Sequence, residues 1–468
     1  MTSFADIVGS DHVLTGAEMA PYLTDWTGAY TGSARAVLRP GSTEEVARIV
    51  ALARSKGLPV TVQGGNTSVS GGSVPGVPDG IVLSLTRMAR IRAVDPVART
   101  ATVDGGVVLQ VLQERVAQDG LDFPLMFAAR GTATIGGALA TNAGGSNVLL
   151  YGNARDQCLG IEAVLADGSV MHGLSGLRKD NSGFDLRHLL CGSEGTLGII
   201  TGAVLQLVPR PRVRATAFLS LAGLEAALDV LNALQDATGG LVEAFEWLPG
   251  EMMRAILAHR PDLRAPLEPV AETHVLVELA STRAGDAEAG AEGATRLDQA
   301  LLAVLEVQMA AGRVLDGAVA ASEAQRQAFW AVREAVLETL VAQDFTHLDI
   351  ALPLSRFADF IAAAAPLAEA AGLRPLLVGH LGDGNVHYAV VGQGGQAPDP
   401  DRLAAFLEAL TELLLAHGGS FSAEHGIGRS KTRVMAAHKD PAQLAAMRAI
   451  KGALDPEGVF NRGVLFGG

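Results

Sequence analysis

The spacing of apolar residues predicts short strands in the first part of the chain. Between residues 35 and 210, runs rich in β-branched residues alternate with glycine-containing turns. The clearest runs are "LPVTVQ", "GIVLSL", "TATVDGG", "GIEAVLADGSV" and "GIITGAVLQLV". One intervening stretch, "STEEVARIVALARSKG", has helical periodicity, with Ser42 three residues before Glu45 as in a capping box and Gly57 at its end. This region is therefore predicted to mix strands and helices.

After residue 210 the pattern changes to long helices rich in alanine and leucine, such as "DRLAAFLEALTELLLAHGG". A few strands intervene, among them "THVLVELAS". We therefore place a first domain at residues 1–210 and a second at 211–455. The loop-like tail at 456–468 is expected to return to the first domain.

One predicted hairpin, "HLGDGNVH", carries two of the 11 histidines. Asp383-Gly384 is a strong signal for a two-residue turn, since glycine adopts a positive φ without steric cost. A turn there would place His380 opposite His387, with Cβ atoms roughly 4.5–5.5 Å apart. That separation suits two imidazoles bound to one metal ion. The alternative is a pair of surface histidines.

Composition limits the classes of function. The chain has 468 residues, 49% of them hydrophobic, which predicts a globular protein with sizeable cores. A formal charge of −14 and 4% aromatic residues argue against a nucleic-acid partner. Cys158 and Cys191 stand in unrelated contexts and suggest no disulfide framework, which fits a reducing compartment. Without a secretory signal or a bilayer-spanning run, we expect a cytoplasmic protein and leave peripheral attachment to the inner membrane open.

Three glycine-rich segments, at 63–72, 131–145 and 192–202, can bring backbone N–H groups close to an anion. None ends in Gly-Lys-Ser/Thr, which excludes a P-loop, and none follows the Gly-x-Gly-x-x-Gly pattern of a nicotinamide site. Three such segments in one domain favour a dinucleotide bound lengthwise.

These segments, together with "LRKDNSGFDLRHLLCGSEGTLGIIT", "GHLGDGNVH" and "SAEHGIGRSK", resemble the FAD-linked 2-hydroxyacid dehydrogenases of the vanillyl-alcohol-oxidase superfamily. The resemblance extends from about residue 35 to 463 and is strongest to the D-2-hydroxyglutarate dehydrogenase branch. D-lactate dehydrogenases and the glycolate oxidase flavin subunit are nearby. It implies an α+β fold, with a two-part FAD-binding domain of the vanillyl-alcohol-oxidase type and an α+β substrate (cap) domain containing an antiparallel sheet.

The resemblance also implies a set of FAD contacts. These are Gly64, Gly65, Asn66, Thr67, Gly71, Gly72, Gly131, Thr132, Gly136, Gly137, Asn142, Gly145, Glu194, Gly198, Ile200 and Asn461. Asn461 stands in "NRGVL", which departs from a commoner Asn-Pro-Gly-Lys. Relatives with covalent flavin carry histidine in the first loop, whereas this chain has Gly65-Asn66. We therefore predict non-covalent FAD.

By the same resemblance, His380, His387 and Glu424 are the expected metal ligands, with His425 beside them as catalytic base. Two imidazoles and a carboxylate suit Zn²⁺ or Mn²⁺ and leave coordination positions open for a substrate. Arg333, in "FWAVREAV", matches the arginine that binds the substrate carboxylate. Its alternative interpretation is an exposed helix residue paired with a neighbour such as Glu334.

Three substrate-side positions depart from the hydroxyglutarate branch: Leu337 replaces threonine, His347 replaces lysine and Ala389 replaces asparagine. Leu337 and Ala389 donate no side-chain hydrogen bond, and an ordinary imidazole is charged only below about pH 6.5. His347 remains the candidate substrate-binding residue at its position. Because an unpaired buried charge is costly, we hypothesise a preference for a monocarboxylate over a dicarboxylate.

The resulting prediction is a flavin dehydrogenase that oxidises a D-2-hydroxy acid, either D-2-hydroxyglutarate or a D-lactate-like acid, to the 2-oxo acid. An unidentified acceptor reoxidises the flavin: an electron-transfer flavoprotein, a quinone or a cytochrome. Two alternatives stay open, namely the flavin subunit of a multi-chain complex of the glycolate-oxidase type and a metal-dependent hydrolase. The sequence leaves a homodimer open.

Overall fold

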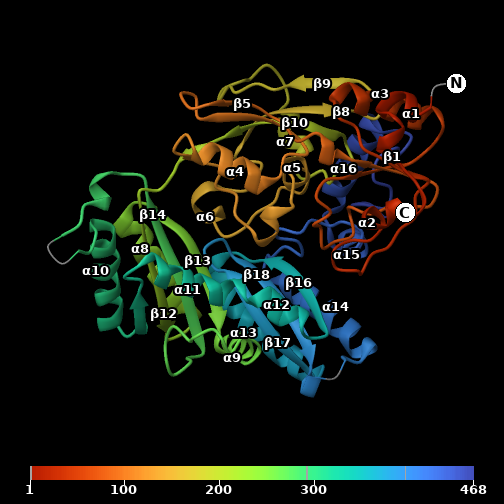
Figure 1. The fold of residues 1–468 in the computed structure, drawn as a ribbon. Coiled ribbons are helices and arrows are strands. Elements are labelled where there is room, and N and C mark those ends of the chain that lie inside the picture. The colour runs from red at the N-terminus through yellow and green to blue at the C-terminus, as the bar shows by residue number, and fades with distance from the viewer. Residues whose placement is uncertain (1–2, 291–292, 396, 468) are drawn as a thin grey trace. The chain divides into compact units, whose positions relative to one another are not determined.

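The computed structural model describes residues 3–290, 293–395 and 397–467 (Figure 1). Contacts between residues divide the chain into two units. The first comprises residues 1–144, 152–210 and 424–468, and the second comprises 145–151 and 211–423. The sequence predicts a domain boundary near residue 210 and a return to the first domain at residue 456. In the structure the chain returns to the first unit at Glu424.

The first unit contains two larger sheets, besides the two-stranded pairing of β11 (Val208–Pro209) with β7 (Leu121–Asp122). One is largely parallel and has the order β1 (Val13–Leu14), β2 (Ala36–Leu38), β4 (Ile81–Ser84) and β3 (Val60–Gln63). The other is antiparallel, in the order β5 (Ile91–Asp95), β6 (Thr100–Asp104), β10 (Ile199–Gln206), β8 (Cys158–Val164) and β9 (Val170–Gly173). The predicted apolar runs form these strands.

Helix α3 (Thr43–Ser55) begins and ends where the sequence predicts. The Ser42 side chain accepts a hydrogen bond from the Glu45 N–H at 3.2 Å, which satisfies one of the unpaired donors of the first turn. Past its end, Gly57 adopts a φ of +64°, a conformation that glycine takes without strain.

Apart from α16, the remaining helices and strands of the first unit are short. They are α1 (Ala5–Val8), α2 (Ala20–Leu23), α4 (Leu109–Ala117), β7 (Leu121–Asp122), α5 (Ile135–Thr141), α7 (Leu186–Leu190), β11 (Val208–Pro209), α15 (Thr432–His438) and α16 (Pro441–Leu454). Among the described residues, no helix combines the length and the apolar character needed to cross a bilayer.

The second unit is built on one antiparallel sheet of seven strands. Their order is β15 (Val314–Val319), β12 (Val213–Leu221), β14 (Thr273–Ser281), β13 (Val242–Pro249), β17 (Leu373–His380), β18 (Asn385–Gly392) and β16 (Phe345–Ala351). The predicted α+β fold with an antiparallel sheet in its second part is confirmed.

Helices cover both faces of this sheet. One face packs against α8 (Leu224–Thr238), α10 (Arg296–Ala310), α13 (Leu354–Ala370) and α14 (Pro400–Ala416). The other packs against α9 (Gly250–His259), α11 (Glu323–Glu334) and α12 (Val336–Val341). Because side chains alternate between the faces of a strand, Val277 packs in the first layer and its neighbour Leu276 in the second.

The histidine hairpin differs from its prediction in register. The structure pairs His380 with Asn385 and Val378 with His387, so His380 and His387 are not directly opposite. The N–H groups of Asp383 and Gly384 both bond to the His380 carbonyl, which makes the turn two residues longer than predicted. A shift of two residues preserves the side-chain alternation, and both histidines still lie on the same face.

The two cysteines also lie closer than their sequence contexts suggest. Cys158 and Cys191 are free and buried. A hydrogen bond with Cys191, together with burial, raises the pKa of the Cys158 thiol. The spacing of 33 positions along the chain carries no signal of this contact, because the two residues belong to different elements of the first unit.

Buried His274 predicts a pH dependence of stability. Burial lowers the pKa of His274, and its Nε2 accepts the Ala271 N–H at 3.2 Å, which requires the neutral ring. The unfolded chain takes up a proton near pH 6.5, before the folded state does. The stability that depends on neutral His274 is therefore present above pH 6.5 and is lost as the pH falls below it.

We expect the His274→Phe variant to lose less thermal stability than the wild type between pH 7.5 and 5.5. Thermal melts of both proteins at the two pH values measure the difference. Equal losses in Tm would contradict the assignment to this residue.

Candidate active site

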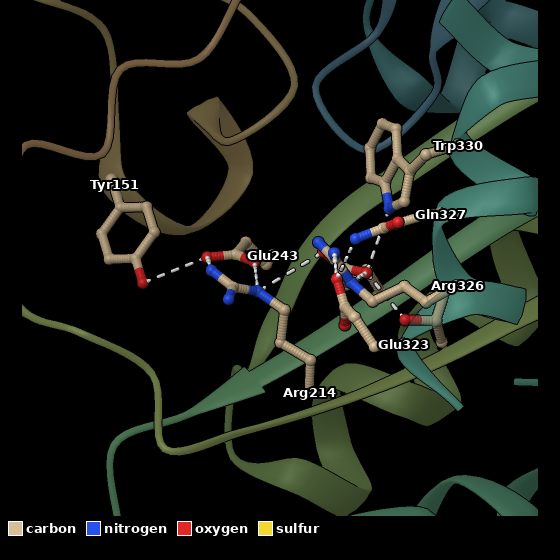
Figure 2. Close-up of polar contacts among 9 residues, drawn as sticks. Tyr151, Arg214, Glu243, Glu323, Arg326, Gln327 and Trp330 are labelled. Atoms are coloured by element: carbon tan, nitrogen blue, oxygen red, sulfur yellow. Dashed lines mark hydrogen bonds and ion pairs between the residues drawn. The ribbon is translucent and has the colours of Figure 1, made fainter. Parts of the chain in front are cut away.

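The polar residues of the second unit gather on the sheet face that carries α11. Arg326, Trp330 and Arg333 are spaced along this helix so that they share one side. Arg326 Nε and Trp330 Nε1 donate to Glu278 Oε2 at 2.7 and 3.0 Å (Figure 2). Three donors on one helix face thus meet carboxylates that rise from the sheet.

A second ion pair lies next to this one. Arg214 Nε donates to Glu243 Oε2 at 2.8 Å, and the Tyr151 hydroxyl, from α6 (Val148–Tyr151), donates to Glu243 Oε1 at 3.4 Å (Figure 2). Burial raises the pKa of Glu243, and Arg214 opposes that effect. Removing charges from water is costly unless they are paired, and here two carboxylates and two guanidinium groups balance.

Glu246 joins the predicted carboxylate-binding arginine to the first predicted metal ligand. It is fully buried, and its two oxygens contact Arg333 Nε at 2.6 Å and His380 Nδ1 at 2.7 Å. Burial alone would raise the pKa of Glu246, but its interactions with His380 and Arg333 outweigh burial and lower it. The alternative interpretation of Arg333, an exposed residue paired with a helix neighbour, is therefore wrong.

The bond to Glu246 orients the His380 ring. A carboxylate that accepts the Nδ1 proton selects the tautomer whose Nε2 carries the lone pair, and it fixes the ring orientation. The His380 and His387 ring centroids lie 5.4 Å apart, at 80° to one another. Two imidazoles in one place, one of them oriented by a carboxylate, fit a Zn²⁺ or Mn²⁺ ion.

His387 lies between a carboxylate and a third imidazole. Buried Asp349 is its cross-strand partner, with Oδ1 3.9 Å from His387 Nδ1. Asn385 Nδ2 donates to the same Asp349 oxygen at 2.9 Å. His347, the predicted substrate residue, stacks on His387 with 5.4 Å between ring centroids.

The chain reaches the other two predicted residues of the metal site directly from this sheet. The Ala423 N–H donates to the Asp349 carbonyl at 3.3 Å, and Glu424 and His425 follow as the first residues of the last segment of the first unit.

The positions that depart from the hydroxyglutarate branch have contrasting surroundings. Ala389 is fully buried on β18 and packs with Leu376 and Val378, while Leu337 on α12 is 43% exposed. An asparagine at 389 would thus enter an apolar layer.

In the first unit, the first and second glycine-rich segments lie against each other. A Cβ at Gly64 would collide with Thr134 Oγ1, and a Cβ at Gly65 would collide with the Thr132 carbonyl. Close packing of the two segments therefore requires glycine at positions 64 and 65. At Gly72 the nearest atom to an added Cβ is 3.6 Å away, so the fold itself leaves room there. Glycine that packing does not require is expected where a ligand approaches the backbone, and this site fits FAD.

Several predicted cofactor residues hold the protein itself together. Asn66 Nδ2 donates to the Thr24 carbonyl at 2.8 Å, and Asn142 Oδ1 accepts the Arg155 N–H at 3.0 Å. Asn461 accepts from the Val62 N–H at 2.8 Å, which brings the tail back to β3.

The other predicted FAD contacts divide unevenly. Gly145 begins the short segment that groups with the second unit. The rest belong to the first unit. Gly136 and Gly137 lie in the first turn of α5, Ile200 lies at the start of β10, and Gly131 ends a short 3₁₀ turn. Loops carry the others: Thr67, Gly71, Thr132, Glu194 and Gly198.

The sequence pattern does not identify Glu246, Asp349 and Asn385 as residues of the site. Their only signal was a polar residue inside an otherwise apolar strand, as in "VEAFEWLP". Such a residue must find a partner when it is buried, but the sequence does not show which one.

Comparisons with known proteins agree with this architecture. Residues 210–465 match the family model described as FAD linked oxidases, C-terminal domain, and residues 34–173 match the FAD binding domain. The solved structure of p-cresol methylhydroxylase aligns with a TM-score of 0.76 over 99% of this chain and 95% of that one, at 17% identity. That likeness concerns the fold alone.

Two curated relatives are similar over most of the chain. D-2-hydroxyglutarate dehydrogenase from Bos taurus is 36% identical over 95% of this chain and 79% of its own length. D-2-hydroxyglutarate dehydrogenase from Xanthomonas citri pv. viticola is 35% identical over 96% of this chain and 93% of its own.

The matched domains define a flavoprotein, an FAD-dependent oxidoreductase. Its fold is of the vanillyl-alcohol-oxidase type. Within that class, the chain belongs to the FAD-linked D-2-hydroxyacid dehydrogenase family.

The Glu246→Gln variant tests the link between Arg333 and His380. An amide presents one acceptor oxygen where the carboxylate presents two, so one of the two partners loses its bond. We expect kcat/KM to fall about 10- to 100-fold, as for other groups that orient a metal ligand. Steady-state kinetics with a D-2-hydroxy acid measure the change.

The matched control is Glu243→Gln, a buried carboxylate on the same strand that contacts neither Arg333 nor His380. Equal losses of activity in the two variants would indicate general damage to the strand and would contradict a specific role for Glu246.

Because loop 63–72 contains no histidine, we expect non-covalent flavin. Precipitation with trichloroacetic acid should leave a colourless pellet and a yellow supernatant. A yellow pellet would contradict this expectation.

Proposed function

We propose that this enzyme oxidises a D-2-hydroxy acid with one carboxylate to the 2-oxo acid, with a divalent metal held by His380, His387 and Glu424. The observation that carries the proposal is the bridge made by Glu246 between Arg333 and His380. One buried carboxylate fixes a guanidinium and an imidazole side by side, as binding of a carboxylate next to a metal would require.

Arg333 and His425 have separate roles in the proposed reaction. Among the described residues only Glu246 engages Arg333, through Nε, so the terminal nitrogens can bind the substrate carboxylate. A bound metal would lower the pKa of the substrate hydroxyl. His425 takes the hydroxyl proton as general base. FAD supplies the acceptor for the hydride from C2.

The apolar surroundings of Ala389 support the choice of a monocarboxylate. Leu376, Val378 and Ala389 are buried on two adjacent strands of the face that carries His380 and His387. None of them can satisfy a second carboxylate, and an unpaired charge there would be costly. A side chain such as that of D-lactate or D-2-hydroxybutyrate meets no such penalty.

Reduced flavin must be reoxidised, so the reaction also needs an external acceptor. An electron-transfer flavoprotein, a quinone or a cytochrome would serve. Activity of the purified chain with an artificial dye acceptor distinguishes an independent enzyme from a subunit that requires partner chains.

An anaerobic titration followed by the visible flavin spectrum tests the proposal. We expect D-lactate or D-2-hydroxybutyrate to bleach the flavin and prior chelation of the metal to abolish bleaching. The L-forms are the controls. A flavin that stays oxidised with every acid, or bleaching that chelation does not affect, would contradict the proposed reaction or the metal's part in it.

Substrate preference has its own measurement, the ratio of kcat/KM for D-lactate and D-2-hydroxyglutarate. We expect the ratio to favour D-lactate. The Leu337→Thr/His347→Lys double variant restores two donors without disturbing buried Ala389, and it should shift the ratio toward D-2-hydroxyglutarate. A much higher kcat/KM for D-2-hydroxyglutarate in the wild type would overturn the monocarboxylate assignment.

A further inference from the structure

Glu194 was expected to contact the cofactor, but its carboxylate binds the protein backbone. Oε1 accepts the Ile427 N–H at 2.8 Å and Oε2 accepts the Gly428 N–H at 2.7 Å. Burial raises the pKa of this carboxyl, and the two backbone donors oppose that effect. Hydrogen bonds from two N–H groups to one carboxylate are charge-assisted and hold consecutive peptides in a fixed orientation.

The backbone of Glu194 is itself anchored on two sides. Its N–H donates to the Ala140 carbonyl, at the end of α5, at 2.7 Å. Its carbonyl accepts from Asn461 Nδ2 at 2.7 Å. Glu194 adopts a φ of +51°, a conformation that costs energy for a residue with a side chain. The surrounding structure therefore holds Glu194 in an unfavourable backbone conformation, in which its carboxylate reaches the Ile427 and Gly428 N–H groups.

The loop it binds begins with the two predicted catalytic-site residues Glu424 and His425. Gly426 has a φ of +70°, and a Cβ there would lie 2.8 Å from Glu194 Oε1, so only glycine allows this approach. Ser70 Oγ donates to the His425 carbonyl at 3.0 Å, and the Ser70 carbonyl accepts the Arg429 N–H at 2.8 Å. Glu194 and Ser70 together hold the loop backbone.

We propose that Glu194 is a positioning residue that sets the backbone from which Glu424 and His425 project. This proposal rests on the function proposed above, in which Glu424 binds the metal and His425 takes the proton. Its carboxylate acts through the peptides of Ile427 and Gly428. The third glycine-rich segment, through Glu194, thus holds the backbone of the loop that begins with Glu424 and His425.

Hydrogen–deuterium exchange of the holoenzyme measures the positioning without any assay of activity. We expect Glu194→Ala to increase exchange in peptides that cover residues 424–431, since both amides lose their acceptor. Glu194→Gln keeps one acceptor and should give an intermediate increase. The matched control is Glu162→Gln, a carboxylate in the same unit that binds Thr43 and Arg92 and does not contact the loop.

Metal affinity and flavin content supply the second readout. We expect Glu194→Ala to bind Zn²⁺ about 10- to 100-fold more weakly, in competition with a chromophoric chelator, while its flavin content stays at the wild-type level. Loss of flavin with unchanged exchange at 424–431 would overturn the proposal and return Glu194 to the cofactor. Faster exchange with unchanged Zn²⁺ affinity and unchanged kcat would also overturn it.

If Glu194→Ala does not fold, Glu194→Gln and Ser70→Ala give the same comparison, because each removes a single hydrogen bond to the loop. Faster exchange and weaker Zn²⁺ binding in both variants support the proposal, and wild-type values in Glu194→Gln overturn it. Failure of the proposed function is distinguishable from failure of the Glu194 proposal. In the first case the wild type itself binds no Zn²⁺, while hydrogen–deuterium exchange still reports whether Glu194 holds the loop.

Discussion

A buried carboxylate must be neutralised where it lies, and Glu246 shows how much structure that requirement organises. Its place on β13 beside β17 sets the cross-strand pairing with His380. Its second oxygen draws Arg333 from α11 onto the sheet. Glu278 likewise binds Arg326 of α11, so two carboxylates of the sheet attach this helix. The Glu243–Arg214 pair joins strands β13 and β12 of the same sheet. The pairing of Arg333 with His380 through Glu246 and the packing of α11 thus have a common electrostatic origin.

The strands, α3 and the face shared by His380 and His387 could be predicted because local rules determine them. Alternation along a strand fixes which residues share a face even when the turn length is misjudged, and the two-residue error in the hairpin left that face unchanged. Turn length itself depends on how Leu381 and Gly384 pack, and a Cβ at Gly384 would collide with the Leu352 carbonyl from another part of the chain. Such non-local contacts leave no periodic trace.

The partners of charged residues could not be predicted for the same reason. Arg333 and Glu246 are 87 positions apart, and nothing in either neighbourhood identifies the other. Glycine-rich segments pose a related difficulty. Gly65 lacks a side chain because the Thr132 carbonyl lies too close, and Gly426 because the Glu194 carboxylate does. At Gly72 no protein atom lies close enough to require glycine. Only the surrounding atoms distinguish glycine that accommodates the fold from glycine that accommodates a ligand.

The hydrogen bond between Val62 and Asn461 joins residues 399 positions apart, and it has a consequence for biosynthesis. The first unit starts near the N-terminus yet takes its final segment from residues 424–468, after the whole second unit has emerged from the ribosome. Strand β3 therefore lacks the C-terminal segment that binds it until translation ends, and apolar surface stays exposed until then. Contacts of such long range slow folding and prolong exposure to aggregation. The second unit, most of it one uninterrupted stretch, can form first, and truncation from the C-terminus would damage the first unit before the second.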